Sequence, residues 1–566
     1  MKTEGLKREI LLLLGIKFVL YIISLLSENF LGTWDDSTDA YLFGGALEDD
    51  AVKQTKLDKL IRKLVSPKIK WDALYFVHIA EKGYTHEKIR AFFPLFPLLM
   101  RVISKGFFFL TKRTAIVLSG LLLSDTCNIM AAAFLYLLTL GLFKNKLFAQ
   151  ITLFFYGIAP ASVFTSALYT EPLFALFTFS GLYFLFIHGA TLIATILFIA
   201  SSGVRSNGVI NAMFVFFYTV TKAFKVFWPQ LKIPIPTPSF RLFKNEHNNH
   251  HNLRNKNIYY QILIFFSILI LGALECVSIC IPSIWQEENA FHQMCLSEAK
   301  VTIKQDGQFI EAEDSISKYD YIPSILQRYI RRFFMTFKIW PIVKKFIPKT
   351  IIGDWSAIEI DQNSMDINQI GNQVHLNFSR DWCIPNIGSD GKVNNGMIYP
   401  YVQSKYWNVG LFKYYQMKQL PNFLLAAPII FLSCSAIYSF IKAQIRKTGA
   451  NDVPKEKNHF PFNSISIIFV LQLFIMLMTF PILHIQVMTR FLNSCPVLFW
   501  HFAHILQSTI IQRNERKIDN KSKKANDDEE KKKIRTRKIR LGLLLFYCIG
   551  YCIIGHIMFA MFQPWT

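Results

Sequence analysis

Long apolar runs separated by short charged connections dominate the chain. A membrane-spanning helix needs about 20 consecutive apolar residues, because every backbone polar group within the hydrocarbon must be satisfied internally. Ten runs meet this requirement, at residues 10–26, 114–142, 147–165, 171–188, 207–228, 259–281, 421–441, 462–483, 491–511 and 541–561. A weaker, shorter run covers 191–203. The pattern predicts an all-α polytopic membrane protein with about 11 transmembrane helices.

Two further segments predict helices that lie at the membrane surface. Residues 71–81 combine a polar and an apolar side at helical spacing, which is typical of an interfacial amphipathic helix. Residues 91–113 are apolar, but they contain two prolines, Pro94 and Pro97, and two cations, Arg101 and Lys105. These residues favour an interfacial or re-entrant helix over a full span.

The basic residues orient these helices. Lysine and arginine in short loops are retained in the cytoplasm. The basic stretches are 144–146, 232–256, 442–457 and 513–540, the last with 13 basic and 6 acidic residues. They predict a single membrane domain over 1–566 with a cytoplasmic N-terminus and a charged cytoplasmic loop at 512–540. Two large loops then face the lumen: 27–113, which holds the interfacial helices, and 282–420.

Composition excludes several other classes of protein. The 566 residues are 52% hydrophobic and their mean hydropathy is +0.29, values that do not suit a soluble multidomain protein. The net charge of +23 lies mainly in the connections, as expected for loops near anionic lipid rather than for nucleic-acid binding. Nine cysteines are too few for a disulfide scaffold.

Polar side chains gather on the predicted lumenal side, at the ends of apolar helices. Ionisable groups are costly there and are usually functional. The candidates are Asp36, Trp71, Asp72, Glu171, Arg205, Asn207, Gln403, Tyr406, Trp407, Lys413, His484, Gln486 and Arg490. A purely structural bundle would have such residues on both sides of the membrane. Their gathering on one side therefore favours an active site on the predicted lumenal side.

Each candidate also has a structural interpretation. Asp72 is placed to begin a helix, and Asp36 to form an Asx turn. Arg205 and Arg490 either extend to the interface or clamp a phosphate group. His484 and Gln486 either satisfy helix ends or contact a substrate. We predict neither a metal nor a cofactor.

Seven sequence blocks follow one another along the chain. The first is Trp71-Asp-x-x-x-Phe76-x-x-Ile79-Ala80-Glu81-x-Gly83-Tyr84 followed by Ala91-Phe-Phe-Pro94-x-x-Pro97. The other six are Asn128 with Ala131 to Tyr136, Pro160-Ala-Ser-x-Phe164-x-Ser-Ala-x-Tyr169-x-Glu171, Arg205-Ser-Asn-Gly208, Tyr401-Val-Gln403-x-x-Tyr406-Trp407-Asn408-Val-Gly410, Lys418-Gln-x-Pro421-Asn422-Phe423 and His484-x-Gln486-x-x-x-Arg490. In this order they resemble the GPI mannosyltransferase 2 family of the endoplasmic reticulum. Seven such motifs in order across most of the chain are far more specific than any one of them.

The resemblance implies a GT-C-type glycosyltransferase in the endoplasmic reticulum membrane, with a lumenal active site. The implied reaction moves the second mannose from dolichyl phosphate mannose to the GPI-anchor precursor, in α-1,6 linkage and with inversion. The implied partners are these two lipid-linked substrates. Fungal members work with a small membrane protein, so an accessory subunit is left open for this chain.

The resemblance also suggests roles for the candidate residues. An inverting transfer needs a general base and positive charge for the phosphate leaving group. Asp72 is our candidate base and Asp36 the alternative, because both lie in the first lumenal loop. Arg205 and Arg490 are candidates for the phosphate. Secondary contacts to the phosphate are expected from His484, Gln486 and Lys413. Aromatic rings that stack on sugars or anchor the interface are expected at Trp71, Tyr406 and Trp407. The predicted substrate-binding set is completed by Glu171, Asn207 and Gln403.

Some features stay open at this point. A GT-C mannosyltransferase with a different acceptor fits the same motifs, and a secondary transporter fits the helix count but not the asymmetric lumenal loops. Asn377 begins a glycosylation sequon in the predicted lumen. Cys295 and Cys383 can pair in an oxidising lumen, although the sequence does not show their distance. Two insertions, at 286–377 and 512–540, match no motif.

Overall fold

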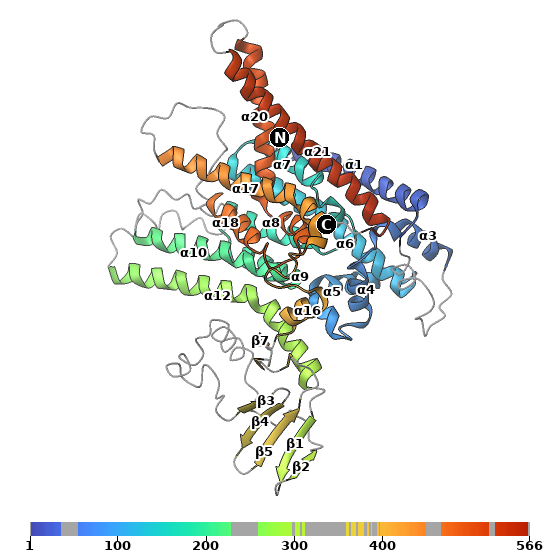
Figure 1. Ribbon diagram of the computed structural model, residues 1–566. Helices are drawn as coiled ribbons and strands as arrows, with labels where there is room; N and C mark the ends of the chain where they lie inside the picture. Colours follow the sequence, from blue (N-terminus) through green and yellow to red (C-terminus); the bar gives the residue numbers. More distant parts are fainter. Residues whose placement is uncertain are drawn as a thin grey trace. The chain divides into compact units, whose positions relative to one another are not determined.

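The computed structural model describes most of the helical chain and parts of one long insertion (Figure 1). The described residues are 2–34, 55–227, 258–296, 300–305, 308–311, 358–361, 364–369, 372–377, 382–383, 386–387, 393–394, 397–448, 466–519 and 527–563. The alternative base Asp36 and the sequence 520–526 therefore lie outside the described residues.

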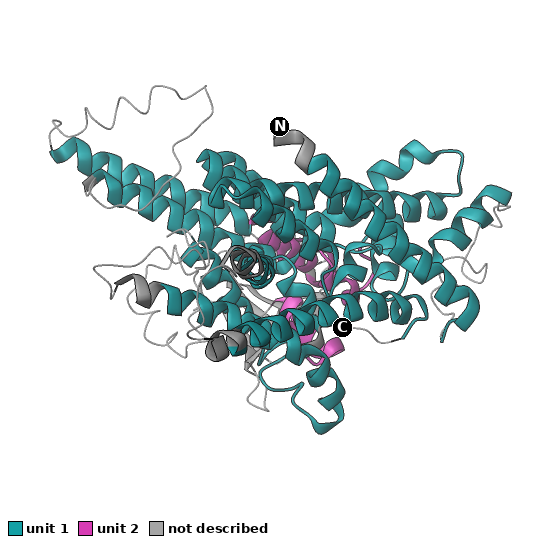
Figure 2. Cartoon of the chain, turned by 90° about the horizontal axis from the view of Figure 1, so that it is seen from above, with its two compact units in different colours: residues 1–83, 94–280, 410–566 teal, residues 84–93, 281–409 magenta. Residues whose placement is uncertain are grey.

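The chain divides into two compact units, coloured separately in Figure 2. Unit 1 comprises residues 1–83, 94–280 and 410–566, and unit 2 comprises residues 84–93 and 281–409. The predicted lumenal loop 282–420 thus supplies most of unit 2. Each unit is described by itself below.

Every apolar segment expected to cross the membrane contains an α-helix in the described residues. The α-helices are α1 (Lys2–Leu31), α3 (Lys56–Val65), α4 (Ala73–Lys82), α5 (Leu95–Ser104), α6 (Lys112–Phe143), α7 (Lys146–Gly157), α8 (Glu171–His188), α9 (Thr191–Val204), α10 (Ala212–Phe227), α12 (Ile258–Phe291), α16 (Ile398–Trp407), α17 (Leu420–Thr448), α18 (Ser466–Met478), α19 (Met488–Leu492), α20 (Pro496–Asp519) and α21 (Asp527–Ala560). This confirms the predicted class, a helical polytopic membrane protein.

Helix length supports fewer membrane crossings than the apolar pattern predicts. Among the described residues, 7 helices are long and apolar enough to cross a membrane, and α9 and α18 are shorter apolar helices. The predicted count of about 11 crossings therefore stays a prediction. The segment 91–113 forms α5, of 10 residues, followed by a 3-10 turn at Lys105–Phe107, which suits the expected interfacial or re-entrant helix.

Unit 1 is built around α6 and α8, which pack along one another, with α9 against α8 and α5 and α7 against α6 (Figure 1). The first helix, α1, packs against the last, α21. Beneath the start of α8 lies a small core of buried side chains that includes Phe164, Tyr169 and Phe559. Short 3-10 turns, η5 (Ser162–Thr165) and η6 (Ser206–Asn211), lie beside α8 and carry chain segments into the same region.

Unit 2 contains strands in addition to helix α16. Strands β1 (Lys300–Gln305), β2 (Gln308–Glu311), β3 (Ile358–Asp361), β4 (Ser364–Gln369) and β5 (Asn372–Asn377) form an antiparallel sheet in the order β2-β1-β5-β4-β3. Strands β6 (Asn386–Ile387) and β7 (Val393–Asn394) make a separate pair. This sheet lies within the unmatched insertion 286–377, where no strands were predicted. The sequon residue Asn377 ends β5.

Helical contacts and a disulfide hold the described part of unit 2. The carboxylate of Glu287 accepts hydrogen bonds from the first backbone N–H groups of α16, at 2.7 Å from Ile398 and 3.1 Å from Tyr399. An acceptor at this place satisfies donors that have no partner within the helix. Cys295 and Cys383, whose pairing the sequence left open, form a disulfide.

Candidate active site

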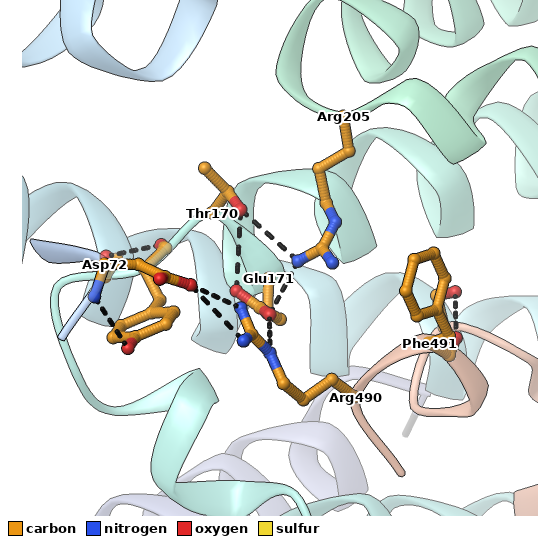
Figure 3. A network of polar contacts seen from close by, with 9 residues as sticks. Asp72, Thr170, Glu171, Arg205, Arg490 and Phe491 are labelled. Atoms are coloured by element: carbon orange, nitrogen blue, oxygen red, sulfur yellow. Dashed lines mark hydrogen bonds and ion pairs between the residues drawn. The ribbon is translucent and has the colours of Figure 1, made fainter. Parts of the chain in front are cut away.

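Four charged side chains, distant in the sequence, meet at the N-terminal end of α8 in unit 1 (Figure 3). Glu171 Oε1 accepts from Arg205 Nη1 at 2.6 Å and from Arg490 Nε at 2.7 Å. The other edge of the Arg490 guanidinium donates through Nη1 and Nη2 to Asp72 Oδ2, both at 3.3 Å. One continuous network therefore contains the predicted base, both predicted phosphate-binding arginines and Glu171.

Asp72 is the residue that precedes α4, but it does not act as a helix cap. Its side chain makes no capping hydrogen bond, and the carboxylate turns instead toward Arg490. Helix-start aspartates usually accept from the first turn of their own helix. The structural interpretation of Asp72 as only a helix-start residue therefore does not fit this geometry.

The backbone turn before α4 is unusual and is held by a tyrosine. Trp71 has φ of 59°, in the left-handed region that non-glycine residues rarely occupy. The hydroxyl of Tyr169 accepts from the Asp72 backbone N–H at 3.2 Å and donates to the Lys70 carbonyl at 3.3 Å. Strained backbone of this kind persists only where the surroundings over-determine it. Here it directs Asp72 into the charged cluster.

The opposite end of α4 is fixed by Arg101 from α5. Its guanidinium donates to the carbonyl of Ala80 at 2.5 Å and to that of Ile79 at 3.3 Å. These carbonyls lie in the last turn of the helix, where a cation is favoured by unsatisfied acceptors and by the helix dipole. Both ends of the helix that carries Asp72 are thus tied to neighbouring elements.

Glu171 and Asp72 differ in how accessible they are. The Glu171 side chain is 5% exposed and is paired with two arginines, whereas the Asp72 side chain is 30% exposed and is paired with one. A general base must reach the proton that it removes. Asp72 meets that condition, and Glu171 is instead the anion that holds the two guanidinium groups together.

Aromatic rings support both arginines. The Arg490 guanidinium carbon lies 4.5 Å from the Phe164 ring centroid and 5.0 Å from that of Tyr169. The corresponding carbon of Arg205 lies 5.3 Å from the ring of Phe491. Cation–π contacts stabilise desolvated guanidinium groups and fix their planes.

The two arginines differ in their remaining donors. Arg490 uses Nε, Nη1 and Nη2 toward carboxylates. Arg205 bonds only through Nη1, to Glu171 and at 3.3 Å to Thr170 Oγ1, so its Nε and Nη2 have no bond to any residue in the described part of the chain. Arg205 also lines a small cavity with room for about one water molecule. Of the two, Arg205 is the better placed to bind a phosphate.

Burial raises the pKa of Asp72 above its ordinary value, and the neighbouring Arg490 guanidinium opposes this rise. The Glu171 carboxylate adds to the rise, because two nearby negative charges repel one another. Arg490 itself loses solvation on burial, but the carboxylates of Glu171 and Asp72 outweigh that loss and raise its pKa. The cluster thus combines a permanently charged arginine with a carboxylate of increased basicity.

The other predicted site residues of unit 1 lie in different surroundings. Asn207 lines the cavity beside Arg205. The indole of Trp71 stacks on Phe562 with ring centroids 4.4 Å apart, so one of its faces is already covered. The imidazole of His484 stacks on Tyr414 at 4.3 Å. Lys413 is exposed, and the side chain of Gln486 lies outside what the structure describes.

Three predicted residues, Gln403, Tyr406 and Trp407, belong to α16 of unit 2. Tyr406 is 41% exposed, and its ring lies 6.2 Å from that of Trp407. Lys405 lies 5.5 Å from the Tyr406 ring centroid. The exposed Tyr406 ring suits an anchor at the interface or a sugar-stacking surface. The Trp407 ring is half-buried and lies 6.2 Å from that of Phe92.

Three residues of the site were absent from the sequence-based list. Tyr169 holds the turn before Asp72, while Asn493 and Ser494 line the cavity. Asn493 and Ser494 follow Arg490 by three and four residues, the spacing that brings side chains to one side of a helical turn. That spacing is the signal that would have found them. In the described ranges, no group of three or more His, Cys, Asp or Glu residues is arranged to hold a metal ion.

Ionisable groups that gather at the ends of apolar helices usually mark a functional site, so the fold and the charged cluster define a polytopic membrane protein with a functional site of this kind. A family model described as "Mannosyltransferase (PIG-V)" matches residues 11–233 and 237–566. The chain belongs to this mannosyltransferase family. It is therefore a glycosyltransferase and a multi-pass membrane protein.

Relatives with curated names extend over most of the chain. The human GPI alpha-1,6-mannosyltransferase 2 is 26% identical over 542 residues, which is 90% of each chain. The GPI mannosyltransferase 2 of Drosophila pseudoobscura is 26% identical over 90% of this chain and 89% of its own length. That of Cryptococcus neoformans is 23% identical over 77% of each.

Among solved structures, the apo oligosaccharyltransferase of Archaeoglobus fulgidus is similar with a TM-score of 0.41 and 11% sequence identity. The match covers 98% of this chain and 56% of the archaeal one.

Proposed function

We propose that this chain transfers a mannose from dolichyl phosphate mannose to the first mannose of a GPI-anchor precursor, forming the α-1,6 linkage. The proposal rests on the family membership and on the names of the relatives, GPI alpha-1,6-mannosyltransferase 2 among them. The observation that carries the chemistry is the meeting of Asp72, Arg490, Glu171 and Arg205 in one network.

The reaction is a single displacement at the anomeric carbon of the donor mannose. The acceptor hydroxyl oxygen forms a bond to this carbon while the bond to the phosphate oxygen breaks. The electron pair of the broken bond leaves with dolichyl phosphate, and the hydroxyl proton passes to a base. A β-linked donor then yields an α-linked product, because the acceptor attacks from the face opposite the leaving group.

Asp72 supplies the base in this scheme. Its carboxylate is partly exposed, and its raised pKa makes it a better proton acceptor than an ordinary aspartate. Arg490 keeps that carboxylate ionised and oriented, since its guanidinium bonds to Oδ2. Asp72 Oδ1 makes no bond to the residues that the structure describes, which leaves it available for the acceptor hydroxyl.

Arg205 receives the leaving phosphate. Negative charge develops on the phosphate oxygens as the sugar departs, and preorganised donors that stabilise such charge contribute strongly to catalysis. Arg205 is fixed by Glu171 and by the Phe491 ring, and its Nε and Nη2 make no bond to the residues that the structure describes. The carboxylate and the leaving-group arginine stand at the two ends of the network, on either side of Arg490.

We propose that the reaction takes place on the lumenal side of the endoplasmic reticulum membrane. The positions of the basic loops predict that Asp72 and the start of α8 lie on this side. The resemblance also implies a lumenal active site. An accessory membrane subunit, as in fungal members, stays a prediction.

The test is conversion of a GPI intermediate in cells depleted of their own GPI mannosyltransferase 2. Expression of this chain is expected to convert the accumulated one-mannose intermediate into the two-mannose form, measured by mass spectrometry of extracted lipids. Linkage analysis is expected to give an α-1,6 bond. A stable, inserted chain that mannosylates another lipid or a protein, and leaves the one-mannose intermediate unchanged, contradicts the proposed acceptor.

A further inference from the structure

The end of helix α21 lies against the segments that carry the charged cluster. The helix packs against η5 and against η2 (Ser66–Lys68), the short turns that precede Tyr169 and Asp72 in the sequence. The last turn of α21 and the two residues after it carry two buried rings, those of Phe559 and Phe562. The backbone N–H of Phe562 donates to the Phe559 carbonyl at 3.1 Å, which keeps the two residues in one turn.

Phe559 supports the rings on which Arg490 rests. Its ring centroid lies 5.9 Å from that of Phe164 and 5.7 Å from that of Tyr169, and both contacts are edge-on. Phe164 and Tyr169 are the two rings beside the Arg490 guanidinium. Edge-to-face pairs at such separations are stabilising beyond the area that they bury. Phe559 therefore lies one layer behind Arg490.

Phe562 supports the other member of the Asp72–Arg490 pair, and it does so through Trp71. The rings of Phe562 and Trp71 are stacked, with planes 15° apart and centroids 4.4 Å apart. Trp71 directly precedes Asp72 and has a φ of 59°, in the left-handed region. A backbone of this kind persists only where its surroundings over-determine it. The stack on Phe562 is thus a second restraint on this turn, in addition to the hydrogen bonds of Tyr169.

Backbone hydrogen bonds fix the position of Phe562 itself. The N–H of Gln563 donates to the Met558 carbonyl at 2.8 Å, and the N–H of Trp34 donates to the Met561 carbonyl at 2.9 Å. These donors satisfy carbonyls at the end of α21 that have no partner within the helix. They tie the residues on either side of Phe562 to α21 and to the segment that follows α1.

We propose that Phe562 is a positioning residue for Asp72 and acts through the indole of Trp71. Without the Phe562 ring, Trp71 loses its partner on one face and the left-handed turn loses a restraint. The Asp72 carboxylate then departs from the orientation in which it bonds to Arg490. The inference rests on the proposed function and deepens it, since Asp72 is the base in that scheme.

The first test is the kinetics of mannosyl transfer by Phe562→Ala in the full-length chain. A displacement of a reacting group by about 1 Å can cost about 10²-fold in rate, so we expect kcat to decrease about 10- to 10²-fold. The KM for the donor is expected to stay within about twofold, because Glu171 and the Phe491 ring hold Arg205. Phe562→Tyr keeps a ring for the stack and is expected to retain at least about half of the rate.

A double-mutant cycle separates positioning from a general effect on stability. If Phe562 acts through Asp72, its ring contributes nothing once the carboxylate is removed. Phe562→Ala is therefore expected to change the residual rate of Asp72→Asn by less than about twofold. An equal fractional loss in the two backgrounds overturns the proposal, because a residue that only stabilises the fold has the same effect in both.

The matched control is Phe546→Ala, which removes a ring from the same helix where the side chain is 80% exposed. It is expected to keep both kinetic constants. Hydrogen exchange of the backbone amides of residues 71–76 reports on the turn without any substrate. In Phe562→Ala these amides are expected to exchange at least about threefold faster than in the unsubstituted chain or in Phe546→Ala. Unchanged exchange in Phe562→Ala overturns the proposal.

These outcomes are separate from those of the proposed function. If the unsubstituted chain does not convert the one-mannose GPI intermediate but Phe562→Ala accelerates exchange at this turn, the acceptor assignment fails and the positioning of the turn by Phe562 stands. If the chain converts the intermediate and Phe562→Ala does so at the full rate, the function stands and the positioning role fails.

Discussion

Asp72 shows how a residue's function depends on which of its possible partners it meets. It occupies the helix-start position that the sequence indicated, yet its carboxylate bonds to Arg490 instead of to its own helix. The sequence could identify the residue because it lies in a specific motif. The sequence does not show whether the Asp72 carboxylate caps α4 or takes part in catalysis, because both roles are possible from the same backbone position.

The Asp72–Arg490 contact predicts a specific pH dependence. Arg490 opposes the rise in the pKa of Asp72 that burial causes, so Arg490→Gln is expected to raise this pKa further. A base works only when deprotonated. The acid limb of the kcat/KM profile is therefore expected to move to higher pH, with kcat/KM on its plateau reduced about 10²-fold.

The control is Arg113→Gln, which breaks the 3.1 Å ion pair with Glu81 in the same unit but does not touch Asp72. It is expected to leave the position of the acid limb unchanged. A plateau loss in Arg490→Gln with no movement of the limb would show that Arg490 is only structural, and would argue against Asp72 as the titrating base.

At the scale of elements, the pattern of apolar residues predicted the positions of most long helices. Runs such as 171–188 and 191–203 became helices with nearly the same limits, Glu171–His188 and Thr191–Val204. The sheet was missed because a search for long apolar runs does not detect short alternating strands. Val301 and Ile303 of β1, paired with Leu376 and Val374 of β5, show that the alternation was present.

The contact between η6 and α9 gives a prediction at this scale. Gly208→Ala is expected to force the Arg205–Asn207 segment away from α9, because the atoms in the way are backbone atoms of Ser202 and Ser201. Overpacking of this kind typically costs about 1–3 kcal/mol. We expect a lower melting temperature in detergent and at least about tenfold lower transfer activity.

Gly550→Ala is the matched control, because a Cβ added there meets nothing within 4 Å and the residue lies inside helix α21. Alanine has the higher helix propensity, so this variant is expected to be neutral or slightly more stable. Equal melting temperatures and activities for the two alanine variants would contradict the close approach at Gly208.

At the scale of the whole molecule, charge and topology predicted that the residues of the charged cluster lie on one side of the membrane, but they did not predict which of them pair. Asp72 and Arg490 are separated by 418 residues, and only helix packing brings them together. The positive-inside rule gives the side of the membrane on which a residue lies, not its neighbours. Asn493 and Ser494 were missed for the same reason, since the small cavity that they line forms only where α8, η6 and the segment around α19 pack together.

The most direct test of the account is the rate of mannosyl transfer from dolichyl phosphate mannose to a one-mannose GPI acceptor by Asp72→Asn, beside Asp125→Asn and Asp36→Asn. Asp125 is ion-paired with Lys68 at 3.1 Å, outside the cluster, so the same chemical change is made without touching the site. We expect kcat to decrease about 10²- to 10⁴-fold in Asp72→Asn, as for loss of a general base, with little change in Asp125→Asn. A folded Asp72→Asn chain that transfers mannose at the rate of the Asp125→Asn control would contradict the account, and a selective loss in Asp36→Asn would move the base to that residue.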